Sequence, residues 1–207
     1  MQFVRTKFFE YGQTETDYLK NVDQILGDAI TRLGKVEREV IPDLFAALIH
    51  AIVGQQISVK ATHTIWRRMQ ERFGGITPPA ITAATVEKIQ QCGMSTRKAG
   101  YIKNIAETMT RGNFNVKELY ELADDEVIKR LSALRGIGVW TAEMLLLNSL
   151  ERPDVVSWGD LAIRRGMINL YGLPEISKQQ FEQYKKRYSP SGSVASLYLW
   201  KLSAERR

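Results

Sequence analysis

The stretch that decides the fold is Leu134-Arg135-Gly136-Ile137-Gly138-Val139-Trp140-Thr141-Ala142. Apolar residues recur at helical spacing on both sides of it, which predicts a tight turn between two helices. Gly136 and Gly138 have no Cβ, so they permit a turn that side chains would obstruct and leave backbone N–H groups accessible at the start of the second helix. Such a turn fits a phosphate group and favours sequence-independent binding of a nucleic-acid backbone. An ordinary glycine-rich helical turn is the alternative.

The rest of the chain has the same helical character. Apolar residues recur every three or four positions, alternating strand patterns are scarce, and Gly and Pro separate the segments. We therefore predict an all-α protein of about ten helices with little sheet. The predicted helices span 16–33, 43–55, 58–73, 84–91, 96–111, 116–122, 124–134, 138–150, 160–171, 177–187 and 192–205.

Composition restricts the class of protein. The chain has 207 residues, 44% of them hydrophobic and 25% charged, which excludes a mostly disordered chain and predicts one domain or two small lobes. No apolar run is long enough for a membrane span and no signal-peptide core is present at the start, so we expect an intracellular, cytoplasmic protein. Cys92 is the only cysteine, which excludes an internal disulfide and a multi-thiolate metal site.

The charge distribution points to an anionic partner. The chain has 29 Lys and Arg against 23 Asp and Glu, a net charge of +6. From Leu161 onward there are nine basic and three acidic residues, so the whole excess lies in this segment. A basic surface of this kind is typical of nucleic-acid binding, although a merely solvated basic face would give the same count.

Four ordered motifs resemble one family. Leu134–Ala142, followed by Asp160 in Val155–Asp160, is similar to the helix-hairpin-helix DNA glycosylases, most closely the 3-methyladenine DNA glycosylase II type. The stretches that resemble other parts of the family are Leu48–Ser58 with its Gly-Gln-Gln turn, Gly93–Ile102 and Tyr198–Trp200. The resemblance covers about 44–202. It implies a two-lobed helical fold with a DNA cleft between the lobes, one lobe formed by 41–150 and the other by 1–40 together with 151–207.

The resemblance also implies a reaction. The family rotates a nucleotide out of the duplex, because the bond to be cut is hidden while the base is stacked. We expect hydrolysis of the N-glycosidic bond of alkylated purines, of the 3-methyladenine and 7-methylguanine type, during base excision repair. Asp160 is the expected catalytic residue, since a fixed carboxylate stabilises an oxocarbenium-like sugar. The same residue is also a predicted helix N-cap, and Asp154 is the nearest alternative carboxylate.

Further site residues follow from the matched positions. Trp140 and Trp200 are expected to line the base pocket and attract a cationic base, with Trp158, Met144 and Tyr198 as weaker candidates. Gln56 is expected to fill the gap left by the extruded nucleotide. The expected DNA-binding residues are Gln56, Arg135, Gly136, Ile137, Gly138, Thr141, Arg164 and Arg165. Core packing for the tryptophans, a backbone-bonding role for Gln56 and a solvated helix face for the arginines are the alternatives.

Cofactor expectations follow from the same resemblance. Trp140 stands where bifunctional relatives have a nucleophilic lysine, so we predict hydrolysis without strand cleavage. No cysteine follows Cys92, which excludes the family's iron–sulfur cluster. No cofactor is required, and a structural Na⁺ or K⁺ is expected at carbonyls of Gly136 and Gly138.

The sequence departs from the family in three ways, and two other functions stay open. Arg135 replaces the usual proline, the Trp-Arg pair before the last helix is missing, and the amino-terminal mixed domain of larger relatives has no room. We expect a monomer that binds duplex DNA containing alkylated bases. The alternatives are a non-catalytic helix-hairpin-helix DNA-binding protein and a glycosylase for oxidised or deaminated bases.

Overall fold

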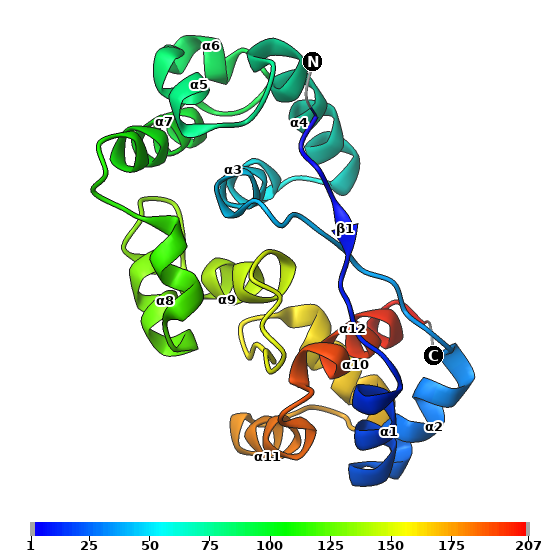
Figure 1. Ribbon diagram of the computed structural model, residues 1–207. Helices are drawn as coiled ribbons and strands as arrows, with labels where there is room; N and C mark the ends of the chain where they lie inside the picture. Colours follow the sequence, from blue (N-terminus) through cyan, green and yellow to red (C-terminus); the bar gives the residue numbers. More distant parts are fainter. Residues whose placement is uncertain (1–2, 206–207) are drawn as a thin grey trace. The chain divides into compact units, whose positions relative to one another are not determined.

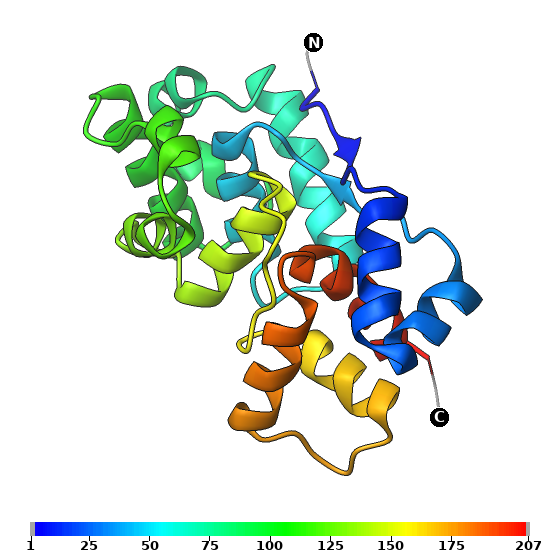
Figure 2. The same ribbon diagram turned by 60° about the horizontal axis from the view of Figure 1, so that its bottom comes forward.

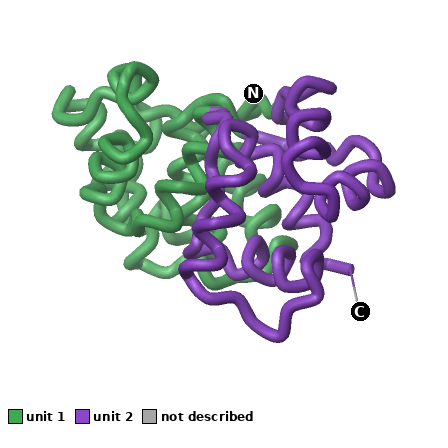
Figure 3. Tube along the Cα trace, turned by 90° about the horizontal axis from the view of Figure 1, so that it is seen from below, with its two compact units in different colours: residues 1–7, 41–150 green, residues 8–40, 151–207 purple. Residues whose placement is uncertain are grey.

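The structure is a computed structural model that describes residues 3–205. The chain divides into two compact units, shown in different colours in Figure 3. Unit 1 contains Ile41–Leu150 and the chain up to Lys7, and unit 2 contains Phe8–Val40 and Glu151–Arg207. Two short strands, β1 (Lys7–Phe8) and β2 (Glu39–Val40), pair where the chain passes between the units. The described residues are otherwise almost entirely helix and loop, which confirms the all-α prediction.

Unit 1 carries the predicted hairpin. Its α-helices are α3 (Leu44–Gly54), α4 (Val59–Phe73), α5 (Pro78–Ala83), α6 (Val86–Gln90), α7 (Thr96–Thr110), α8 (Asp124–Ser132) and α9 (Val139–Asn148), with a 3₁₀ helix, η1, at Val116–Glu121. Helix α3 is apolar on nearly all sides because it is in contact with α4, α7 and α9 (Figure 1). Helices α8 and α9 also pack together, which places the turn between them at one end of the pair.

Unit 2 is built from α1 (Gln13–Val22), α2 (Gln24–Leu33), α10 (Leu161–Tyr171), α11 (Lys178–Tyr188) and α12 (Gly192–Ser203). Helices α10 and α12 lie against each other, and α1 and α2 pack on them (Figure 2). Gly166 makes the close approach possible, because a Cβ at this position would lie 2.1 Å from the carbonyl oxygen of Leu199. The packing of α10 on α12 fixes the start of α10, where Asp160 lies.

Several predicted boundaries are wrong for identifiable reasons. The single helix predicted at 16–33 is two helices, because the extended Asp23 ends α1 and its carboxylate caps α2 by accepting from Leu26 N–H. The helix α5 lies outside every predicted range, since its first turn contains Pro78 and Pro79, at positions where proline is tolerated. The predicted helix at 116–122 is 3₁₀ rather than α.

The start of the chain is also assigned differently from the prediction. Residues up to Lys7 belong to unit 1, not to the lobe formed by 1–40 and 151–207. A hydrogen bond from Val4 N–H to the Gln70 side chain on α4 holds this segment. Among the described residues, no helix is both long and apolar enough to pass through a membrane.

Candidate active site and nucleic-acid interface

Asp160 begins α10 and is buried, with 6% of its surface exposed. One carboxylate oxygen, Oδ1, accepts hydrogen bonds from the backbone N–H groups of Ala162 (2.8 Å) and Ile163 (2.9 Å). The same oxygen accepts from Nε1 of Trp200 at 3.2 Å. All three donors therefore act on one oxygen at the N-terminal end of α10. Asp160 is therefore an N-cap, and it is also a carboxylate held in one orientation beside the Trp200 indole.

Arg38 joins this cluster from another segment of unit 2. Its guanidinium carbon lies 4.6 Å from the ring centre of Trp200, which is a cation–π contact. Desolvation lowers the pKa of Arg38, and the negative charge of Asp160 acts in the opposite direction. Sequence reasoning missed Arg38, because it lies far from Asp160 along the chain and in no motif.

A second contact between an arginine and a tryptophan lies at the start of α10. Arg164 is one turn after Asp160, and its guanidinium carbon is 4.6 Å from the ring centre of Trp158. Trp158 meets Phe181 edge to face at 5.2 Å. The Nε atom of Arg164 is buried without a hydrogen-bond partner among the described residues. A guanidinium held flat on an indole still has terminal N–H groups of the kind that bind phosphate. Arg165 is exposed.

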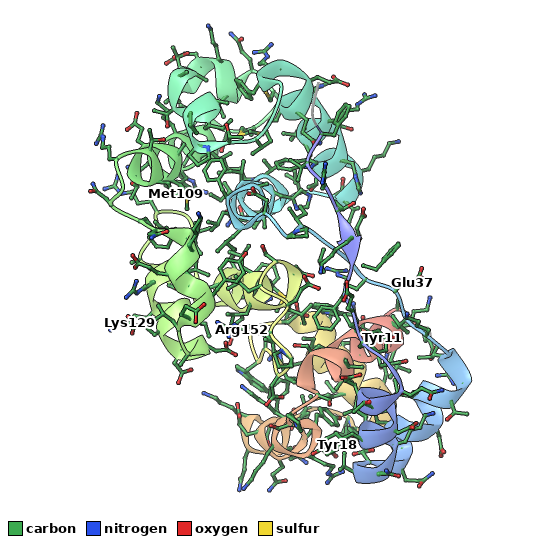
Figure 4. The ribbon with its side chains drawn as sticks, in the orientation of Figure 1. Tyr11, Tyr18, Glu37, Met109, Lys129 and Arg152 are labelled. Atoms are coloured by element: carbon green, nitrogen blue, oxygen red, sulfur yellow. The ribbon has the colours of Figure 1, made fainter. Side chains whose placement is uncertain are left out.

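Tyr198 lies on a different side of α12 from Trp200. Two residues correspond to about 200° around a helix, so the two side chains diverge. The Tyr198 hydroxyl donates to the carbonyl of Gly34 (3.0 Å) and lies 3.3 Å from the hydroxyl of Tyr11, which is labelled in Figure 4. Burial, followed by the contact with Tyr11, raises the pKa of Tyr198. Tyr198 lines a cavity of about 370 Å³ whose lining does not include Asp160. The structure therefore does not bring Tyr198 together with the Asp160 cluster.

Asp154, the alternative carboxylate, is engaged in the loop before α12. One of its oxygens accepts from Ser189 Oγ at 2.5 Å and the other from Gly192 N–H at 3.1 Å. A side chain on Gly192 would collide with Asp154, since its Cβ would lie 2.5 Å from the carboxylate. These contacts give Asp154 a structural role in the loop before α12.

The hairpin of unit 1 connects α8 and α9 through Ala133–Gly138. Gly136 has φ +90°, and an added Cβ would lie 2.5 Å from the Tyr101 ring, so both backbone conformation and space require glycine. Gly138 is the N-cap of α9 and has no side chain to satisfy the first N–H groups of this helix. The start of α9 therefore has the form of an anion-binding turn.

The remaining predicted residues of unit 1 differ in exposure. Arg135 and Gln56 are exposed, and Trp140 is 45% exposed. Ile137, Thr141 and Met144 are buried. Ile137 thus packs into the hairpin, and its backbone N–H already donates to the Leu134 carbonyl at 3.1 Å.

Two residues that were not predicted as site residues contact Gly136, and a third contacts Gln55. Gln55 Nε2 donates to the Gly136 carbonyl at 2.8 Å, and the Tyr101 ring packs against Gly136. Lys98 Nζ donates to the carbonyls of Val53 (2.9 Å) and Gln55 (2.6 Å). Gln55, Lys98 and Tyr101 lie within motifs that resemble the family, so the motifs contained them without revealing that they meet.

The expected Na⁺ or K⁺ site would use the carbonyl oxygens of Gly136 and Gly138. The Gly136 carbonyl accepts from Gln55, and the Gly138 carbonyl accepts from Ala142 N–H at 2.9 Å. Each of these carbonyl oxygens accepts one hydrogen bond and has a second lone pair, so the Na⁺ or K⁺ site stays a prediction. No step described below depends on a cation.

Comparison with known proteins gives a consistent result. Residues 49–190 match the family model described as HhH-GPD superfamily base excision DNA repair protein. The chain is 38% identical over 164 residues to DNA-3-methyladenine glycosylase 1 of Schizosaccharomyces pombe, covering 77% of this chain and 72% of the relative. It is similar to the crystal structure of DNA-3-methyladenine glycosidase from Bacillus halodurans, with a TM-score of 0.82, 34% identity, and coverage of 97% of this chain and 93% of that one.

A third comparison includes nucleic acid. The 3-methyladenine DNA glycosylase of Schizosaccharomyces pombe in complex with abasic DNA has a TM-score of 0.80 and 32% identity, covering 91% of this chain and 95% of that one. The hairpin and Asp160 lie within residues 49–190, which the family model matches, whereas Tyr198–Trp200 lies outside them. The chain belongs to the HhH-GPD superfamily of base excision DNA repair proteins.

Proposed function

We propose that the protein is a monofunctional DNA glycosylase that hydrolyses the N-glycosidic bond of alkylated purines, of the 3-methyladenine and 7-methylguanine type, in duplex DNA. Family membership, the glycosylase names of the relatives and the solved complex with abasic DNA support action on DNA. The observation that carries the proposal is the buried Asp160 carboxylate, oriented by two backbone N–H groups and the Trp200 indole.

The proposed reaction breaks one bond and forms one. The bond between C1′ of deoxyribose and the base nitrogen breaks, and its electron pair leaves with the base. Positive charge develops on the sugar, and Asp160 stabilises it electrostatically. The oxygen of a water molecule then bonds to C1′ and loses a proton, which leaves an abasic site and a free base. An alkylated purine with a positive charge is a good leaving group, so no strong general acid is required.

Other residues bind the DNA in this proposal. The hairpin around Gly136 and Gly138 binds a phosphate through backbone N–H groups, and Arg164 offers a guanidinium oriented by Trp158. Trp200 offers an aromatic face for the base, with Trp140 as a second candidate. Trp140 stands at the position of the nucleophilic lysine of bifunctional relatives, which supports hydrolysis alone. We expect the protein to act as a monomer inside the cell.

A panel of duplexes tests the proposal, each with one lesion: 3-methyladenine, 7-methylguanine, 8-oxoguanine or hypoxanthine. We expect release of the methylated purines and an intact abasic strand, with no covalent complex trapped by borohydride. Release of only the oxidised or deaminated bases would contradict the substrate assignment. Binding to every duplex without release of any base would indicate the non-catalytic alternative.

A further inference from the structure

We propose that Gln55 and Lys98 are positioning residues that join the exposed loop Gln56–Lys60 to the glycine hairpin, so that one rigid part of unit 1 both binds the DNA backbone and presses against the base stack. This inference rests on the proposed function and extends it to two residues outside the expected site.

The loop Gln56–Lys60 has the surface expected of a part that contacts bases. All five residues are exposed, and the apolar side chains of Ile57 and Val59 are 39% and 74% exposed. Apolar side chains gain little beside phosphates, whereas they fit between the faces of bases, as in proteins that wedge into a duplex. The exposed apolar side chains of Ile57 and Val59 therefore favour a base-stack contact, while Lys60 at the end of the loop has the charge to bind a phosphate.

The loop is held in an unfavourable conformation. Gln56 has φ +56°, a left-handed backbone conformation that a residue with a Cβ adopts only when its surroundings enforce it. Within the loop, Ser58 caps α4 and accepts at its Oγ from Ala61 N–H, so the last two loop residues, Val59 and Lys60, are also the first residues of α4. On the near side, the chain is fixed at Gln55, the last residue before the loop.

Gln55 is fixed by two independent contacts. Its side chain donates to the Gly136 carbonyl of the hairpin at 2.8 Å. Its own carbonyl accepts from Lys98 Nζ at 2.6 Å, and the same ammonium group bonds the Val53 carbonyl. These two carbonyls belong to the end of α3, where backbone acceptors lack partners and a positive charge is favourable.

Helix α7 contacts both the end of α3, where the loop begins, and the glycine hairpin. Lys98 and Tyr101 are three residues apart, so they share one face of α7. Lys98 holds the end of α3, and Tyr101 packs against Gly136 in the hairpin. The loop and the hairpin are therefore linked twice, once through the Gln55 amide and once through α7. Because of this link, the loop that presses against the base stack is held at a fixed position relative to the hairpin that binds the DNA backbone.

The test compares two duplexes that carry the same methylated purine. In one the lesion is fully paired, and in the other it lies opposite a mismatched base, where extrusion costs less. We expect Gln55→Met to lower the single-turnover rate about tenfold on the paired lesion and by less than about twofold on the mismatched lesion. Lys98→Met should show the same pattern, and Lys98→Arg should restore part of the rate because it keeps a donor and a charge.

Two controls separate positioning from stability. Gln90→Met makes the same chemical change at an exposed position on α6 and should leave both rates unchanged. Melting temperatures identify any variant that fails to fold. If Lys98→Met does not fold, Gln55→Met alone provides the test. An equal loss on both duplexes, or no loss, would overturn the inference while leaving the glycosylase proposal intact. A wild-type protein that releases the base from neither duplex would overturn the proposed function, and this inference with it.

Discussion

Asp160 shows how one residue serves structure and chemistry at once. A helix start needs an acceptor for its first N–H groups, and a carboxylate supplies it. The same donors keep the oxygen in one place. From the sequence, the N-cap role and the catalytic role of Asp160 are alternatives. The geometry shows that the capping role is occupied and that it is compatible with the proposed catalytic one.

Arg38 is expected to influence which bases are released. Its charge lies on the Trp200 face, close enough to Asp160 for the two to interact, so it repels a cationic base more than a neutral one. We predict that Arg38→Gln raises the release rate of 7-methylguanine relative to that of neutral hypoxanthine, by about two- to tenfold. Competition between the two lesions in one reaction measures this ratio.

Arg32→Gln is the matched control for Arg38. It removes one positive charge from unit 2, where Arg32 forms an exposed ion pair with Glu205. The ratio of the two rates should not change in this variant. If Arg38→Gln and Arg32→Gln shift the ratio equally, the effect is one of net charge and the assignment to the Trp200 face is wrong.

At the scale of elements, the two hairpin glycines are predicted to differ. Gly136 has a positive φ and faces Tyr101, whereas Gly138 has φ −92° and open space where a Cβ would be. We expect Gly136→Ala to lower the free energy of unfolding by about 1–3 kcal/mol and to weaken DNA binding. Gly138→Ala should change the stability of the fold little. Urea unfolding and DNA titration of both variants measure these effects, and equal stability losses would contradict the assigned geometry.

The elements also show what sequence can and cannot predict. Helical periodicity found α3, α4, α7 and α9 within a few residues, because their caps and apolar faces are local features. It missed the break at Asp23, where a local N-cap contact to Leu26 is combined with contacts to distant partners. Asp23 Oδ2 accepts from Tyr171 (2.7 Å) and Arg187 (2.6 Å), so the buried carboxylate is stabilised by α10 and α11. No pattern in residues 16–33 contains that information.

In the candidate site, too, local sequence features were predictable and contacts between distant segments were not. The motifs predict Asp160, Trp200, Gln56 and the hairpin glycines as site residues. Arg38 and the link from Gln55 to Gly136 were missed, because they are contacts between segments distant in sequence. A motif indicates which residues belong to a site, whereas the contacts between these residues depend on how distant segments pack together.

At the scale of the whole molecule, the net charge of +6 predicts salt-sensitive DNA binding. Each phosphate contact releases counterions, so the logarithm of affinity should fall linearly with the logarithm of salt concentration. We expect Arg164→Gln to reduce the magnitude of this slope by about one if the stacked guanidinium binds a phosphate. Titration of a short duplex at several salt concentrations measures it. An unchanged slope would mean that Arg164 serves only to pack on Trp158.

The most direct test of the account is single-turnover release of a methylated purine by Asp160→Asn. Asparagine is as good an N-cap as aspartate, so the variant should keep its start of α10 and melt close to the wild type. It lacks the negative charge, so we expect the rate to fall at least about a hundredfold while DNA affinity is retained. Release at the wild-type rate by a folded variant would contradict the claim that this carboxylate stabilises the developing sugar cation.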